Sequence, residues 1–216
     1  YSAGQRSQAD NLMRQLASQK PGDPDQVYAS GLYLSGNDQD RAALAHLNTL
    51  PRDKWNGNIQ ALADRLQSNQ VLETANRLRD SGKEQEAETL LRQQPPSTRI
   101  DLTLADWAEQ RGDHEAAKTA YNTILQREPQ NEDAILGLTE VYLAQGNKDA
   151  ARAALAKLPA AQNGEPLSIN MQRRLAMAQA GLGDRAAAEK TFNAILPQAK
   201  SQPPSMESAL VMRDAA

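Results

Sequence analysis

Residues 98–129 read TRIDLTLADWAEQRGDHEAAKTAYNTILQREP, and this stretch decides the fold. Leu104, Ala105 and Ala108 are spaced as on one helical face, and Gly112 follows them as a residue that ends a helix. Asp113 can then cap a second helix, which Pro129 ends because proline has no amide hydrogen. The apolar stripe of that second helix comprises Ala116, Ala117, Ala120, Tyr121, Ile124 and Leu125. The stretch therefore predicts a helical hairpin.

The hairpin pattern recurs along the chain, punctuated by Gly4, Gly36, Gly82, Gly112, Gly146 and Gly183. The fifth residue after five of these glycines is alanine, and a large apolar residue follows four positions later. The exception is the unit of Gly36, where Ala43 fits only with two extra turn residues. The units close with Pro21, Pro51, Pro95, Pro129, Pro159 and Pro197. Repetition of this kind predicts an all-α solenoid, a right-handed superhelix in which each hairpin packs on its neighbours.

Successive glycines are separated by 32, 46, 30, 34 and 37 residues. The 37-residue step is explained by a longer loop, Ala160 to Ser168. The 46-residue step requires an extra helix, and residues 53–67 supply one through Ile59, Leu62 and Leu66. The spacing of apolar residues along the helix is interrupted at residues 68–70. We therefore expect an unpaired helix before this interruption, which redirects the superhelix and divides the chain near residue 67. One continuous helix over 58–79 is the alternative.

The expected organisation follows from these units. Residues 1–52 hold a partial first repeat and one complete repeat, and residues 53–67 form the inserted helix. Four further repeats occupy 68–199, and 204–216 begin another one. Because the chain starts just before a repeat glycine and stops within a helical pattern, it reads as an internal piece of a longer protein.

Composition narrows the possible partners. The net charge of -3 and the pI near 5.5 give no basic excess for binding phosphates, which argues against nucleic acid. The chain has no cysteine, so disulfides and thiolate metal sites are excluded. No apolar run is long enough to cross a bilayer.

Residues suited to catalysis are scattered. His46 and His114 each lie alone in a second-helix segment, so packing is the expected role of both. No glycine-rich phosphate loop and no nucleophile with its base can be assembled. A glycosidase would need a shielded carboxyl in an aromatic cleft, and the sequence predicts neither. We therefore expect no enzyme activity, no metal and no cofactor.

The best unit resembles the tetratricopeptide repeat family, and the resemblance rests on Leu104, Ala105, Gly112, Ala117, Tyr121, Ile124 and Pro129. Other units match in part; Thr74, Thr139 and Gln94 depart from the family pattern. The resemblance implies that extended segments of partners bind in a groove lined by the first helices. The groove candidates are Tyr33, Asn76, Arg79, Asp106, Glu109, Glu140, Arg173, Arg174 and Met177. Along the chain, the acidic candidates come in the middle and the two arginines come after them. This order favours a partner whose charges are complementary in the same sequence.

A narrower resemblance involves residues 59–94 and 101–159, which are similar to the repeat region of a family of bacterial cellulose-export proteins. Those proteins have a long periplasmic tetratricopeptide region followed by an outer-membrane β-barrel. The resemblance implies a periplasmic scaffold within an outer-membrane protein, with partners among the envelope components that make and export cellulose. Two alternatives stay open: direct binding of cellulose or peptidoglycan, and a cytosolic repeat adaptor. Only Tyr33 is placed for stacking on a sugar, which does not support a continuous aromatic track.

Overall fold

The computed structural model describes residues 22–159, 161–162, 165–201 and 206–214. The partial first repeat, with Gly4, and the loop residue Gly164 lie outside the described residues, as do the first residues of the repeat expected from 204. The described chain is almost entirely helical, and it divides into two compact units, residues 1–95 and residues 96–216. The predicted all-α repeat fold is confirmed, whereas the division comes between Pro95 and Pro96 and not near residue 67.

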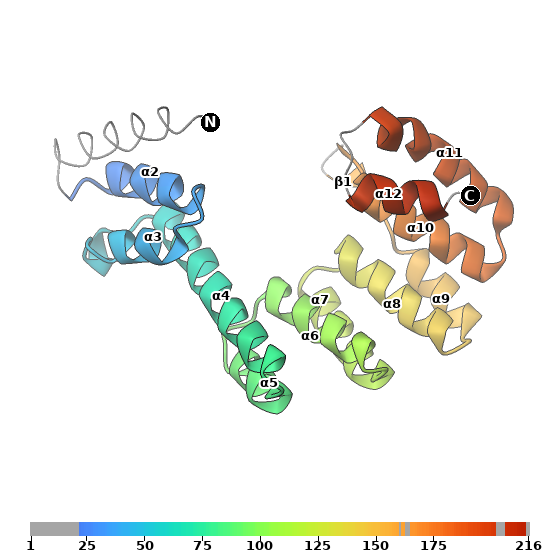
Figure 1. The fold of residues 1–216 in the computed structure, drawn as a ribbon, viewed down its shortest axis with the longest axis horizontal. Coiled ribbons are helices and arrows are strands. Elements are labelled where there is room, and N and C mark those ends of the chain that lie inside the picture. The colour runs from blue at the N-terminus through green and yellow to red at the C-terminus, as the bar shows by residue number, and fades with distance from the viewer. Residues whose placement is uncertain (1–21, 160, 163–164, 202–205, 215–216) are drawn as a thin grey trace. The chain divides into compact units, whose positions relative to one another are not determined.

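The first unit consists of α2 (Pro24–Ser35), α3 (Asp40–Leu47), the short 3-10 helix η1 (Arg52–Lys54), α4 (Gly57–Asp80) and α5 (Glu84–Arg92). The helices α2 and α3 form a hairpin that packs against the first half of α4, and the second half of α4 pairs with α5 (Figure 1). The buried core of the first hairpin includes Leu47, Ile59 and Leu66. Trp55 packs against this core and donates its indole N–H to the carbonyl of Leu50 at 3.0 Å.

The helix expected over 53–67 is not separate, because α4 runs without interruption through Ser68, Asn69 and Gln70. These polar residues contain no glycine or proline that would break the helix. The apolar stripe changes phase because the helix changes partner: Leu66 packs with α2 and α3, whereas Leu72 is buried in the half that pairs with α5. The continuous helix, our alternative, is the one observed.

The second unit consists of α6 (Thr98–Gln110), α7 (His114–Arg127), α8 (Glu132–Ala144), α9 (Lys148–Leu155), β1 (Ala161–Gln162), β2 (Glu165–Pro166), α10 (Ile169–Leu182), α11 (Arg185–Ser201) and α12 (Met206–Asp214). Three hairpins are formed by α6 with α7, α8 with α9, and α10 with α11. The first helices are also neighbours: α8 contacts both α6 and α10, and α10 contacts α12 (Figure 1). The strands pair antiparallel inside the expected loop, with Gln162 opposite Glu165.

One proline does not close its unit. The helix α11 continues through Pro197 to Ser201, although proline removes one helical hydrogen bond. Burial of Ala199, which is 1% exposed, in the cluster that also contains Ile195 and Val211 keeps this last turn packed. Packing thus outweighs the local helix-ending signal at Pro197.

The hairpin turns share one backbone geometry. Gly82, Gly112, Gly146 and Gly183 have φ of 77°, 75°, 72° and 90°, the left-handed conformation that glycine adopts without steric cost. In the first hairpin this position belongs to Asp38, with φ of 59°, whereas Gly36 is right-handed with φ of −66°. Ala43 is the fifth residue after Asp38, so the two extra turn residues are explained: Asp38 is the counterpart of the repeat glycines.

The second helices begin at the predicted caps. The carboxylates of Asp113 and Asp184 accept from the amides three residues on, at 3.0 and 3.1 Å, and the Asn147 side chain does the same at 3.1 Å. Among the departures from the family pattern, Thr139 is fully buried and donates its hydroxyl to the carbonyl of Ile135 at 2.8 Å. Its polar group is therefore satisfied within α8.

Candidate functional site

One position recurs on the first helices, six residues before the left-handed residue of each turn, and it is exposed in all of them except α8, where it is half-buried. It is occupied in turn by Leu32, Asn76, Asp106, Glu140 and Met177. Leu32 and Met177 are 40% and 46% exposed and are the exposed large hydrophobic side chains of the described chain. In the second unit we call the surface formed by Asp106, Glu109, Asp133, Glu140, Arg173, Arg174 and Met177 the first-helix face.

Sequence reasoning chose Tyr33, as an aromatic residue that could lie in the groove, and missed its neighbour Leu32. Counting from Asp38, the residue that is left-handed, would have found Leu32. Tyr33 is half-buried, and its carbonyl accepts from the Asn37 side chain at 2.8 Å. Asn76 is exposed on the second half of α4, and Arg79 is half-buried one turn further on.

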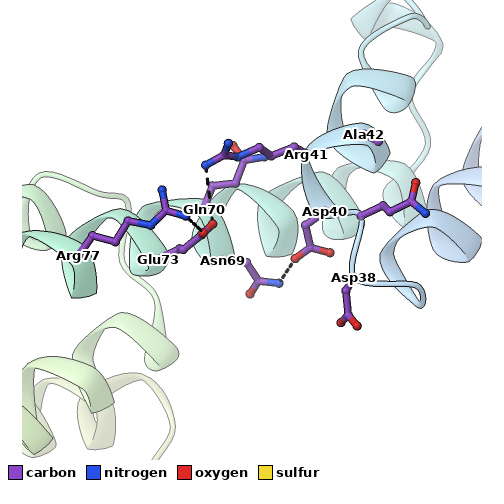
Figure 2. Close-up of a pocket in the computed structure, with 9 residues that line it drawn as sticks. Asp38, Asp40, Arg41, Ala42, Asn69, Gln70, Glu73 and Arg77 are labelled. Carbon is purple, nitrogen blue, oxygen red and sulfur yellow. Dashed lines mark hydrogen bonds and ion pairs between the residues drawn. The ribbon is translucent and has the colours of Figure 1, made fainter. Parts of the chain in front are cut away.

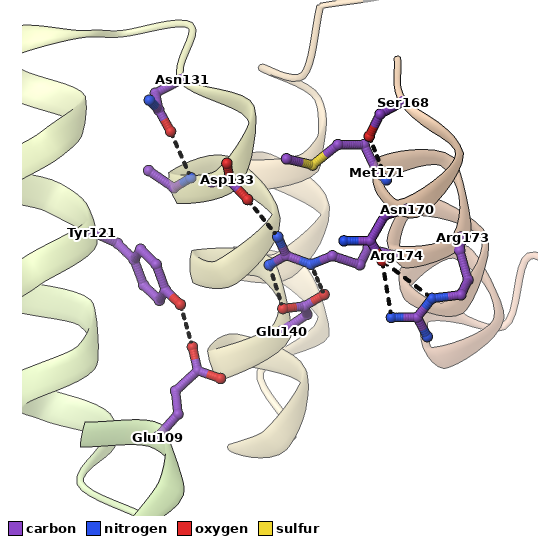
Figure 3. A network of polar contacts seen from close by, with 11 residues as sticks. Glu109, Tyr121, Asn131, Asp133, Glu140, Ser168, Asn170, Met171, Arg173 and Arg174 are labelled. Atoms are coloured by element: carbon purple, nitrogen blue, oxygen red, sulfur yellow. Dashed lines mark hydrogen bonds and ion pairs between the residues drawn. The ribbon is translucent and has the colours of Figure 1, made fainter. Parts of the chain in front are cut away.

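Arg174 joins two of the first helices. From α10 its guanidinium donates to both oxygens of Glu140, at 2.9 and 2.7 Å, and to Asp133 at 3.0 Å, both on α8 (Figure 3). Burial opposes its charge, but the hydrogen bond and the charge of Glu140 outweigh burial and raise the pKa of Arg174. The side chain is 18% exposed, so this bidentate pair is held away from most solvent. Arg174 is therefore a structural clamp between neighbouring repeats.

Arg173 is also engaged within the second unit. Its guanidinium donates to Asp214 of α12 at 2.6 Å and, at 3.4 Å, to Asn170 one turn earlier. The carboxylate of Asp214 is shared with Arg213, and although burial opposes its charge, these two arginines lower the pKa of Asp214. Both arginines predicted to make the later part of the groove basic thus have carboxylate partners inside the fold.

Glu109 and Tyr121 form the other polar contact of this face. The Tyr121 hydroxyl, from α7, donates to Glu109 of α6 at 2.5 Å (Figure 3). Gly137 on α8 makes room for the ring, since a Cβ there would lie 2.2 Å from a Tyr121 ring carbon. Burial raises the pKa of Glu109, the hydrogen bond from Tyr121 opposes that rise, and the charge of Glu140 adds to it.

Asp106 and Met177 are the most accessible of the predicted residues in the second unit. Asp106 is exposed and accepts from Gln110 at 2.7 Å, one turn away on the same helix. Met177 presents a flexible apolar side chain to solvent three residues beyond Arg174. A partner crossing this face would therefore meet a carboxylate on α6 and an apolar contact on α10.

Both histidines are half-buried within helices. Burial lowers the pKa of His46, which is half-buried on α3, and His114 begins α7. Within the described ranges, no group of three histidine or acidic side chains is arranged to hold a metal ion. None of the described helices is both long and apolar enough to cross a membrane.

Comparisons with known proteins agree with this geometry. Residues 108–168 match a family model described as tetratricopeptide repeat. A crystal structure of a tetratricopeptide repeat protein from Parabacteroides merdae, 17% identical, has a TM-score of 0.52 over 88% of this chain and 70% of that one. The chain belongs to the tetratricopeptide repeat family.

Curated relatives are more specific. The tetratricopeptide-repeat chain is 71% identical, over all 216 residues, to cellulose synthase operon protein C of Escherichia coli K12. It is 29% identical over 76% of its length to the protein of the same name from Pseudomonas fluorescens. The chain spans only 18% of the E. coli relative and 13% of the P. fluorescens one.

Proposed function

We propose that this chain is a non-catalytic interaction module of the bacterial cellulose synthesis and export machinery. It works in the periplasm as part of an outer-membrane protein and binds other envelope components. The observation that carries the proposal is the similarity, over all residues of this chain, to a segment of relatives named cellulose synthase operon protein C, on a fold made of stacked hairpins. Repeat solenoids of this kind offer extended surfaces for binding.

The first-helix face is the surface that we assign to the partner. It spans three neighbouring helices, α6, α8 and α10, so an extended segment can contact several repeats at once. Its accessible members are Asp106 and Met177, whereas Arg174 and Glu140 hold the helices together. Contacts with the partner are therefore expected at the first pair, and changes in the second pair would disturb packing instead.

A capture experiment tests this assignment. The immobilised chain is incubated with solubilised envelopes of a cellulose-producing bacterium, and captured proteins of the cellulose operon are quantified. We expect Asp106→Lys and Met177→Glu to reduce capture of the same operon component, because each places an unfavourable charge on the face. Matched controls are Asp149→Lys and Ala153→Glu on the exposed side of α9, which should capture as the wild type does. Equal capture by all four variants would remove the assignment.

A further inference from the structure

A polar pocket lies in the first unit, between the start of α3 and the middle of α4 (Figure 2). Its volume is about 590 Å³, within the range of small-molecule sites. The pocket exists because α4 is longer than the hairpin on which it packs: Leu66 is its last residue in that core, and polar side chains follow. It is separate from the first-helix face, which belongs to the second unit.

The walls of the pocket are close to charge balance. The charged residues that line the pocket are Asp38, Asp40 and Glu73 with Arg41 and Arg77, three carboxylates and two guanidinium groups. Asp40 accepts from Asn69 at 2.7 Å and from Ser35 at 3.0 Å. Arg77 is hydrogen-bonded to Glu73, and Arg41 lies 4.0 Å from the same carboxylate (Figure 2). Because the carboxylates and guanidinium groups nearly balance, neither an anion nor a cation finds a strong net attraction in the pocket, and a neutral ligand suits it.

Other groups at the pocket are available to a ligand. Within the part of the chain that the structure describes, the side chains of Asp38, Gln39 and Gln70 have no protein partner, and Arg41 has only the long contact with Glu73. Gln39 occupies the N-cap of α3, yet its side chain makes no capping bond. Together these groups provide hydrogen-bond donors and acceptors along the lining of the pocket. A hydroxyl is both a donor and an acceptor, so a polyhydroxylated molecule can hydrogen-bond to groups of either kind.

The backbone at the pocket gives an independent observation. Four of the five described hairpin turns have glycine in the left-handed position, and only the turn at the pocket places a side chain there, that of Asp38. Aspartate adopts this conformation at some energetic cost, and such strain is concentrated at functional sites. The cost is explained if the Asp38 carboxylate serves the pocket that it lines.

We propose that this pocket binds a neutral, hydroxyl-rich ligand, namely a sugar unit of a glycan chain. Gln39, Gln70, Arg41 and Asp38 supply the hydrogen bonds. No aromatic ring is among the described residues that line the pocket, so binding depends on hydrogen bonds and is weak, with a Kd of about 1 mM. The site gives the chain a glycan contact distinct from the protein contact proposed above.

Nuclear magnetic resonance titration of the isotopically labelled 216-residue chain tests this proposal. One arm uses cellotetraose and the other uses chitotetraose, which distinguishes a glucan from an amino-sugar glycan. We expect saturable shifts of the backbone amides at 38–42 and 69–73 in at least one arm. Gln70→Ala should weaken binding about tenfold, as expected for loss of a hydrogen-bonding group. Gln67→Ala, an exposed glutamine outside the pocket on the same helix, is the matched control.

Asp38→Gly separates binding from folding. Glycine suits the left-handed backbone, so this variant should melt no lower than the wild type while its sugar affinity falls. The proposal is overturned if the pocket amides show no saturable shifts with either sugar. Unchanged sugar affinity in both pocket variants would overturn it too, and so would a stronger response to a short peptide than to either sugar. The proposed protein contact on the first-helix face is tested independently of the sugar pocket. In the capture experiment, Asp38→Gly should retain the operon component as well as the wild type does.

Discussion

The left-handed residue of each hairpin turn is where a single side chain affects stability through the backbone alone. A Cβ added at Gly112 would meet no atom within 4 Å, so Gly112→Ala changes only the conformational energy. We expect it to lower the free energy of unfolding by about 1 kcal/mol. Asp38→Gly relieves the same strain and should raise the free energy of unfolding. The gain should be only about 0.5 kcal/mol, because glycine loses more conformational entropy on folding than aspartate does. Urea unfolding followed by circular dichroism measures both changes.

Gly57→Ala is the control for this pair. Gly57 opens α4, has no close neighbour for a Cβ, and is not left-handed. Its replacement should be neutral or slightly stabilising, since alanine favours helices. A Gly112→Ala protein as stable as Gly57→Ala would contradict the backbone explanation.

Gly137 has a different role, because its missing Cβ leaves space for a ring. In Gly137→Ala the new methyl would overlap the Tyr121 ring, and we expect a loss of about 2 kcal/mol from overpacking. Gly181→Ala is the comparison: its Cβ would lie 3.1 Å from a methyl of the Leu143 side chain, which can move. The gain in helix propensity should keep Gly181→Ala near the wild type in the same unfolding assay. Equal costs at the two positions would argue against the ring contact.

Glu109 predicts a pH dependence. Because burial raises its pKa in the folded state, the folded protein binds a proton more readily than the unfolded chain. Its stabilising contribution is complete below the ordinary value of 4.5 and is lost as pH rises through the raised pKa. Glu109→Gln keeps an acceptor for Tyr121 but does not titrate. The free energy of unfolding of Glu109→Gln, measured by urea unfolding and compared with that of the wild type, should therefore increase from pH 4 to pH 7. A difference between the two proteins that does not change with pH would contradict a raised pKa of Glu109.

At the scale of elements, one arginine connects two helices that the loop at 160–168 separates in sequence. Arg174→Met removes three charge-assisted hydrogen bonds to α8 and should lower the free energy of unfolding by about 2 kcal/mol. Arg92→Met removes a pair with Glu88 inside α5 in which the arginine side chain is 59% exposed, and it should cost less than about 0.5 kcal/mol. Thermal unfolding compares the two arginine variants. Similar losses in both would mean that Arg174 contributes no more than a surface pair.

Features that depend on residues close in sequence could be predicted, whereas features that depend on packing between residues distant in sequence could not. The caps Asp113 and Asn147 act on amides three residues away, so local spacing predicted them. The continuity of α4 depends on its exchange of partners from α2 and α3 to α5, which no local pattern reports. Likewise, Arg174 and Glu140 are 34 residues apart, and only packing of α10 on α8 brings them together.

The candidate sites show the same limit. Asp106 and Met177, two of the predicted groove residues, are exposed, and exposure is a property that the helical period can indicate. The pairing of Arg173 with Asp214 was not predictable, since the choice of ion partner is made in space. The pocket beside Asp38 was missed, although the two extra residues before Ala43 were a signal that this turn differed.

The whole molecule places its two proposed contacts in different units. The sugar pocket belongs to the unit of α2–α5, and the first-helix face belongs to the unit of α6–α12. Each unit has a buried core of its own, one around Leu47 and Leu66 and another around Tyr121 and Ile124. Binding at one site should therefore be measurable with the other site altered.

Separate cores also predict separate stabilities. In repeat proteins stability is the sum of local terms and nearest-neighbour interfaces. Leu47 is fully buried, so Leu47→Ala should destabilise the first unit by about 3 kcal/mol. Hydrogen exchange of the full chain, read by mass spectrometry, should then accelerate in α2, α3 and the first half of α4 but stay unchanged in α7 and α8. Ile124→Ala, also fully buried, is the reciprocal variant and should accelerate exchange in α6–α8 alone. If either substitution accelerated exchange throughout the chain, the two units would unfold as one cooperative structure, because independent cores transmit no loss of stability to each other.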